Sequence, residues 1–107
     1  MTAIRVRVGS WSPPRFRRKP VISRNGRICI VREDYGRYSL VHAPTGLGLH
    51  HRLQGLRLSE ARRALALAAP LCDWDWTDPE WVKGLHWRQS LDLWDALVTI
   101  AEMVEAV

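Results

Sequence analysis

Residues 21–32, VISRNGRICIVR, are the stretch that decides the fold. Two strand-like runs flank Asn25-Gly26, a dipeptide that favours the positive-φ positions of a two-residue type I′ hairpin turn. The residues ICIV at 28–31 are apolar at every position, which is typical of a strand buried on both faces. The stretch therefore predicts a β-hairpin whose second strand lies at the centre of a sheet.

Further strands are expected on both sides of this hairpin. Turn-forming residues at 33–36 and 43–46 separate it from two more strand-like segments, 37–42 and 47–50. Before the hairpin, residues 4–8 (IRVRV) alternate apolar and charged side chains, so their arginines are expected to face solvent or a ligand. We therefore predict an antiparallel β-meander of three to five strands in the N-terminal half.

Residues 9–20 (GSWSPPRFRRKP) interrupt this strand pattern. Three prolines remove backbone donors, and four cations and two aromatic residues crowd the same segment. We expect an extended basic arm or a long loop there.

The pattern changes to a helical period in the second half of the chain. Ser59 is the expected N-cap of a first helix, and Glu60 lies favourably at the positive end of the helix dipole. Pro70 limits that helix to about three turns, because a proline in a helix interior removes a hydrogen bond and clashes with the preceding turn.

Two more helices are expected towards the C-terminus. Asp78-Pro79-Glu80 predicts the start of a short helix that ends near Gly84. Ser90 is the expected N-cap of a long helix with one apolar face. The residues of that face are Leu91, Trp94, Leu97, Val98, Ala101 and Val104.

These elements define an α+β fold in one domain, residues 1–107, in which the β-meander packs against two or three α-helices. The charge divides along the same line. Residues 1–63 carry fourteen Arg or Lys and three acids, whereas residues 64–107 carry two bases and eight acids. We expect a basic β-rich layer over residues 1–55, including the arm at 9–20, and an acidic, Trp-rich helical layer over residues 56–107.

The expected localisation is the cytoplasm. The N-terminus lacks the apolar stretch of a signal peptide, and no apolar run approaches the length of a membrane span. Cys29 and Cys72 show no metal or redox spacing and are expected to be buried, reduced thiols.

The basic layer has the composition of a nucleic-acid contact, because arginines neutralise phosphates and aromatic rings stack on bases. Its candidate residues are Trp11, Arg15, Phe16, Arg17, Arg18, Lys19, Arg24, Arg27, Arg37 and Tyr38. The alternative is that the arginines solvate the outer face of the sheet and pair with the acidic half of the chain or of a neighbour.

The order of elements over residues 27–69, three strands followed by a helix that begins Leu58-Ser59-Glu60-Ala61, resembles AP2-type and integrase arm-type DNA-binding domains. Those domains insert the sheet in the major groove. The resemblance implies that Arg27, Arg37 and Tyr38 contact DNA. The C-terminal helical half has no counterpart in those domains.

The acidic layer suggests a protein contact instead. Exposed tryptophans rimmed by acids are typical of binding hot spots, and the candidates are Asp73, Trp74, Asp75, Trp76 and Trp81. The alternative is that these tryptophans cover the end of a small core. Trp94, by contrast, lies on the apolar face of the long helix and is expected to be a core residue.

No catalytic motif, zinc-ligand spacing or cofactor-binding motif is visible, so we expect no enzyme, no metal and no cofactor. The leading hypothesis is a small non-enzymatic binding module that engages nucleic acid or another acidic surface. The alternative is a protein-binding adaptor or inhibitor of phage or mobile-element type, such as an anti-CRISPR-like blocker. Self-association through the two charged halves is a third reading, and the oligomeric state stays open.

Overall fold

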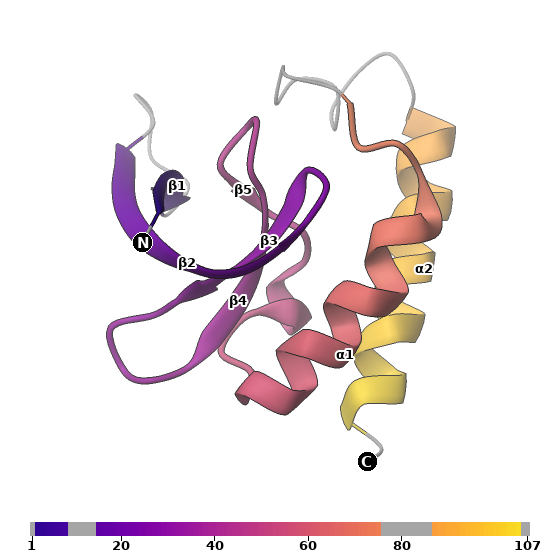
Figure 1. Ribbon diagram of the computed structural model, residues 1–107. Helices are drawn as coiled ribbons and strands as arrows, with labels where there is room; N and C mark the ends of the chain where they lie inside the picture. Colours follow the sequence, from indigo (N-terminus) through magenta and orange to yellow (C-terminus); the bar gives the residue numbers. More distant parts are fainter. Residues whose placement is uncertain (1, 9–14, 76–86, 106–107) are drawn as a thin grey trace.

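The computed structural model describes residues 2–8, 15–75 and 87–105, and the side chains among them except those of residues 87–91. It is an α+β fold with a five-stranded antiparallel sheet from the N-terminal half and two α-helices from the C-terminal half, as predicted (Figure 1). The strands are β1 (Ala3–Val8), β2 (Arg15–Asn25), β3 (Ile28–Arg32), β4 (Tyr38–His42) and β5 (Leu47–Gly48). The helices are α1 (Leu58–Ala68) and α2 (Trp87–Glu105), with the 3₁₀ turns η1 (His51–Leu53) and η2 (Ala69–Leu71).

The sheet is a meander in the order β1-β2-β3-β4-β5, and it curls strongly. The pairing of β2 with β3 shifts register between Val21 and Ser23, and a bulge of this kind bends a strand and increases its twist. Figure 1 shows β2 sweeping in an arc from β1 towards β3. The two edges of the curled sheet approach each other. The Arg7 amide of β1 donates to the Gly46 carbonyl, in the turn before β5, at 2.8 Å. The result is a half-closed barrel.

The central strand β3 is buried on both faces, as its unbroken apolar run predicts. Ile28 and Ile30 face the helices with Leu40 of β4, whereas Cys29 and Val31 face the interior of the curl. The residues of the smaller inner cluster are Val6, Cys29, Val31 and Val41. The two faces of one sheet thus carry two separate apolar clusters.

The turn between β2 and β3 differs by one residue from the prediction. Asn25 pairs with Ile28, so the two loop residues are Gly26 and Arg27. Gly26 has a φ of 62°, but the φ of Arg27 is not positive, since Trp74 is the one described non-glycine residue with a positive φ. A type I′ turn needs positive φ at both loop residues and therefore does not form here.

The predicted arm at residues 9–20 is partly a strand. Arg15–Pro20 belong to β2 and pair with β1 in register from Val8 to Ala3. Pro20 is tolerated because β2 bends close to it and its pairing partner changes from β1 to β3 there. The composition of residues 9–20 predicts a loop. Residues 15–20 form a strand instead, because β1 pairs with them along its whole length.

The helices cover one face of the sheet (Figure 1). Helix α1 packs on β3 and β4, and α2 packs on α1. Helix α1 begins at Leu58 with Arg57 at its N-cap position, so the prediction of Ser59 as the N-cap is wrong by two residues. The Glu60 carboxylate accepts from the Arg57 amide at 2.8 Å, which satisfies an N-terminal donor without Ser59. Pro70 lies in η2, directly after the helix, as predicted.

Helix α2 begins at Trp87 rather than after Ser90, and its predicted apolar face is correct in its second half. Leu97, Ala101 and Val104 are buried. Trp94 is 42% exposed, so its prediction as a core residue is wrong. Its ring lies at the edge of the helix face, with its centroid 4.0 Å from that of His50. The predicted short helix at 78–84 lies outside the described residues. Among the helices that the structure describes, none has the length and apolar character to cross a membrane.

Candidate functional site

The pairing of β1 with β2 brings three arginines and a phenylalanine to one face of the sheet. Arg5 lies opposite Arg18, and Arg7 lies opposite Phe16. Residues directly opposite each other on antiparallel strands share a face, and so do residues two apart on one strand. The other face of β1 carries Val6, which is buried in the inner cluster. Arg5, Arg7, Phe16 and Arg18 therefore form one outward surface, here called the outer arginine face.

The arginines of this face are close to one another and to an aromatic ring. The Arg5 guanidinium carbon lies 4.3 Å from the centroid of the Phe16 ring, a cation–π contact. Phe16 is 39% exposed, so its ring is open to solvent as well. Among the described residues, no acidic side chain forms an ion pair with Arg5 or Arg18. Like charges directly opposite each other are destabilising, and an anion that binds there relieves the repulsion.

A cavity of about 400 Å³ adjoins this face between β1 and the β4–β5 turn. Arg5 and Phe16 form part of its lining, and residues 43–46 form its far wall. The turn approaches β1 closely because Gly46 has a φ of 73° and no side chain. A Cβ at Gly46 would lie 2.6 Å from the Arg5 carbonyl oxygen. The outer arginine face therefore has a concave edge beside its aromatic ring.

The predicted basic residues do not form one surface. Arg18 and Phe16 lie on the outer arginine face, whereas Lys19 lies on the opposite face of β2 and binds Glu33. Arg17 also lies on the opposite face, where it forms an exposed ion pair with Asp34. Arg15 is exposed near the start of β2.

The remaining predicted contacts are spread around the sheet. Arg24 donates to the Gly26 carbonyl at 2.7 Å, and Arg27 donates to the Asp73 carbonyl at 3.3 Å. Arg37 is exposed, and Tyr38 is half-buried against the core that faces the helices. Trp11 lies outside the described residues.

Arg5 and Arg7 were not among the predicted contacts. Their signal was present in the alternation of residues 4–8, which indicated arginines on the solvent side of a strand. The sequence does not show which strand pairs with this one or in which register. The juxtaposition of Arg5 with Arg18 and Phe16 depends on that register.

The charge separation between the two layers is only partly neutralised inside the molecule. Arg52 of η1 lies 2.7 Å from Glu105 and 3.7 Å from Glu102, and these ion pairs join the sheet layer to α2. The other ion pairs among the described residues, those of Arg17 and Lys19, stay within the basic layer. The outer arginine face takes part in none of them.

The predicted acidic tryptophan site is divided as well. Trp74 is 4% exposed, and its indole nitrogen donates to the carbonyls of Ala68 and Ala69 at 3.2 and 3.3 Å. It therefore satisfies carbonyls at the C-terminal end of α1, and its ring is not presented to a partner. Asp73 and Asp75 on either side are exposed. Trp76 and Trp81 lie outside the described residues.

The two thiols lie in surroundings that disfavour their reactive form. Cys29 is buried, and desolvation raises its pKa to about 11, an effect that the charge of Arg24 opposes. Burial also raises the pKa of Cys72. The thiolate is the reactive form of cysteine, so both side chains are held as protonated thiols at neutral pH. Among the residues that the structure describes, no group of three His, Cys, Asp or Glu side chains is arranged to hold a metal ion.

His42 joins the sheet to the segment after α1. Its Nε2 donates to the Trp74 carbonyl at 2.8 Å, and its Nδ1 forms a hydrogen bond of 2.8 Å with the Thr45 hydroxyl. A carbonyl only accepts, so Nε2 carries a proton; in the neutral ring Nδ1 then accepts from the Thr45 hydroxyl. Burial lowers the pKa of His42; the hydrogen bond to Trp74 opposes this effect and the charge of Arg27 adds to it. Burial also lowers the pKa of His50, and the charges of His51 and Arg52 lower it further.

These two histidines predict a pH-dependent stability. A histidine whose pKa is lower in the folded state binds its proton more readily after unfolding, so stability is full above the unfolded pKa of about 6.5 and is lost as pH falls below it. We expect each histidine to contribute a slope of up to about 1.4 kcal/mol per pH unit below that point. Chemical denaturation between pH 8 and pH 5 measures the slope, and His42→Gln should make it shallower. An unfolding free energy that does not change over this range would contradict the prediction.

Comparison of the chain with protein-family models, with curated proteins and with solved structures found no match. The function is therefore inferred from the residues themselves.

Proposed function

We propose that the protein is a non-enzymatic binding module that engages nucleic acid through the outer arginine face. The observation that carries the proposal is the position of Arg5, which lies opposite Arg18 and within 4.3 Å of the Phe16 ring centroid, with no acidic partner for either arginine among the described residues. Guanidinium groups bind phosphates through paired hydrogen bonds, so two neighbouring arginines without acidic partners favour a ligand that carries several phosphates.

The aromatic ring favours an unpaired strand over a duplex. Proteins that bind single strands without reading their sequence combine a positively charged track with rings on which bases stack. Phe16 lies on the same face as the arginines and is open to solvent. The 400 Å³ cavity beside it gives an unstacked base further room. Single-stranded DNA or RNA is the partner that these features fit best.

Titration of labelled single-stranded and duplex oligonucleotides over a salt series tests this function. We expect binding at low salt that weakens as salt rises, with a log–log slope of about 0.7 for each phosphate contact on a single strand. The double variant Arg5→Gln/Arg18→Gln should lose affinity and reduce that slope by about 1.4. Phe16→Ala should weaken binding and leave the slope unchanged, because it removes stacking and no charge.

Arg62→Gln/Arg63→Gln is the matched control. It removes the same charge from exposed positions on α1, in the other layer of the molecule. We expect it to bind like the unaltered protein. Absence of binding at low salt, or equal losses in the two double variants, would contradict the proposed function; equal losses would show that only net charge matters.

A further inference from the structure

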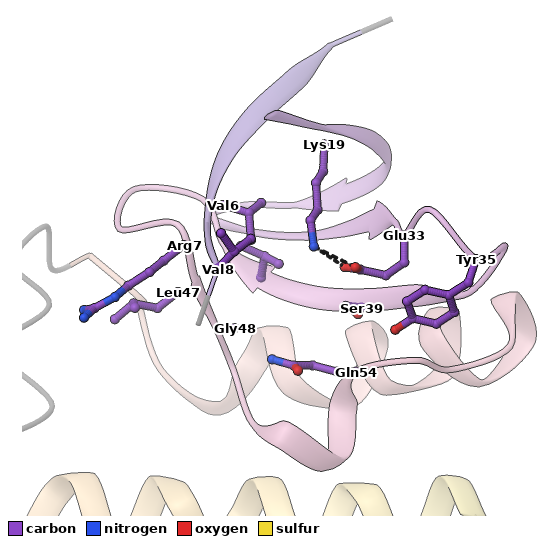
Figure 2. A pocket seen from close by; sticks show the side chains of 11 residues that line it. Val6, Arg7, Val8, Lys19, Glu33, Tyr35, Ser39, Leu47, Gly48 and Gln54 are labelled. Carbon is purple, nitrogen blue, oxygen red and sulfur yellow. Dashed lines mark hydrogen bonds and ion pairs between the residues drawn. The ribbon is translucent and has the colours of Figure 1, made fainter. Parts of the chain in front are cut away.

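The inside of the curled sheet holds a second cavity, on the opposite side of β1 from the outer arginine face. Its volume is about 630 Å³, within the range of small-molecule sites. Valine side chains of β1 and β4 form its apolar walls, and they are those of Val6, Val8 and Val41. Figure 2 shows the polar side chains of Lys19, Glu33, Ser39 and Gln54 around the same space.

An ion pair lies at one side of this cavity. The Lys19 ammonium donates to both carboxylate oxygens of Glu33, at 2.8 and 2.6 Å. The two side chains are only 15% and 13% exposed. Burying such a pair costs desolvation energy, and apolar residues of similar volume often stabilise a fold as well or better. The pair gives the cavity a strong donor and a strong acceptor with no net charge.

Two further polar groups lie across the cavity. The Ser39 hydroxyl is buried and accepts from the Gly55 amide at 3.2 Å, and its own proton has no acceptor among the described residues. The Gln54 amide lies against Gly48, where a Cβ would overlap the Gln54 amide nitrogen. Glycine at position 48 therefore leaves room for an amide that both donates and accepts.

We propose that this cavity binds a nucleobase. A base is a flat, uncharged ring system with donors and acceptors along its edge. The valine walls match its faces, and the hydroxyl, the amide and the Lys19–Glu33 pair match its edge. The absence of net charge in the ion pair disfavours an ionised group inside. One cavity therefore offers apolar walls for the faces of a base and polar groups for its edge.

Arg7 connects the cavity to the outer arginine face. Arg7 borders the cavity, and Figure 2 shows its side chain extending away from the interior. A phosphate attached to the bound nucleoside can therefore meet a guanidinium outside the cavity. Tyr35 lies at another side of the opening with its ring largely exposed. A nucleotide within a strand and a free nucleotide offer the cavity the same base. The inference rests on the proposed function only where the base is taken to come from a strand.

The test begins with binding of each ribonucleoside monophosphate, followed by amide chemical shifts of the isotope-labelled protein. We expect at least one of them to bind and to shift the amides of Ser39, Gly48 and Gln54. Val8→Trp, which fills the cavity from β1 on the same face as Val6, should weaken this binding at least tenfold. Gln54→Leu, a substitution at an exposed position, should weaken it several-fold. Leu71→Trp is the control, because it places the same bulk on a partly exposed leucine after α1.

A second arm identifies the source of the base. An oligonucleotide with abasic sugars throughout should no longer shift the amides of Ser39, Gly48 and Gln54, although it binds with the same salt slope as the normal strand because its phosphates are intact. If the normal strand binds, but neither the nucleotides nor the change to an abasic strand alters the amide shifts of the cavity residues, the base site is refuted and the proposed function stands. If nucleotides bind and strands do not, the site takes a free nucleotide and the proposed function is refuted. Failure of both strands and nucleotides to bind refutes both.

Discussion

Replacement of Trp74 by alanine is expected to lower the free energy of unfolding by about 3–5 kcal/mol, the range for loss of a large buried aromatic side chain. The indole is 4% exposed and belongs to the core cluster between the sheet and the helices. Its nitrogen also donates to two carbonyls at the end of α1, which lose that donor in the variant. Guanidinium denaturation followed by far-ultraviolet circular dichroism measures the change, since six tryptophans complicate fluorescence.

Trp94→Ala is the matched control for this prediction. Trp94 is the same residue type in the same layer, but it is 42% exposed and packs on His50. We expect its loss to cost less than half as much as the loss of Trp74, because less apolar area returns to water. Equal losses for the two variants would show that the indole of Trp74 does not occupy the core as described.

The two tryptophans also show where sequence reasoning reaches its limit. The helical stripe placed Trp94 in the core, but a stripe is a wide sector, and a residue at its edge can be covered or exposed. Trp74 lies between Asp73 and Asp75, in a stretch with neither a helical nor a strand period. It is buried because the nearby end of α1 meets His42 of β4 there, 32 residues away in the chain. Such contacts have no local signature.

The same distinction applies to the sheet. The meander, the buried strand β3 and the sheet-and-helix layering follow from local patterns of period and turn chemistry, so the sequence predicts them. The curl of β2 comes from a register shift that composition does not encode. The basic composition of residues 15–19 predicts one surface that contains both Arg18 and Lys19. The two side chains point to opposite faces of β2, because they are neighbours on a strand. The outer arginine face cannot be predicted from the sequence, because it depends on the register between β1 and β2.

The Lys19→Met variant is the second large effect that we expect. Removal of the ammonium leaves the Glu33 carboxylate without its ionic partner at a position where its side chain is 13% exposed. Removing one member of a buried pair typically costs about 3–5 kcal/mol, whereas replacing both members is often nearly neutral. The double variant Lys19→Met/Glu33→Leu should therefore regain most of the stability that the single variant loses. Denaturation of the unaltered protein, both single variants and the double variant completes the cycle.

Arg17→Met provides the comparison within the same strand. Arg17 and Lys19 lie on the same face of β2, and each pairs with an acid of the β3–β4 turn. The Arg17–Asp34 side chains are 61% and 71% exposed, so water screens their attraction and we expect a loss of no more than about 1 kcal/mol. If Lys19→Met is as mild as Arg17→Met, water reaches the inner pair freely. The cavity would then lack the dry polar edge on which a base must form its hydrogen bonds, and the case for a base site would weaken independently of any binding measurement.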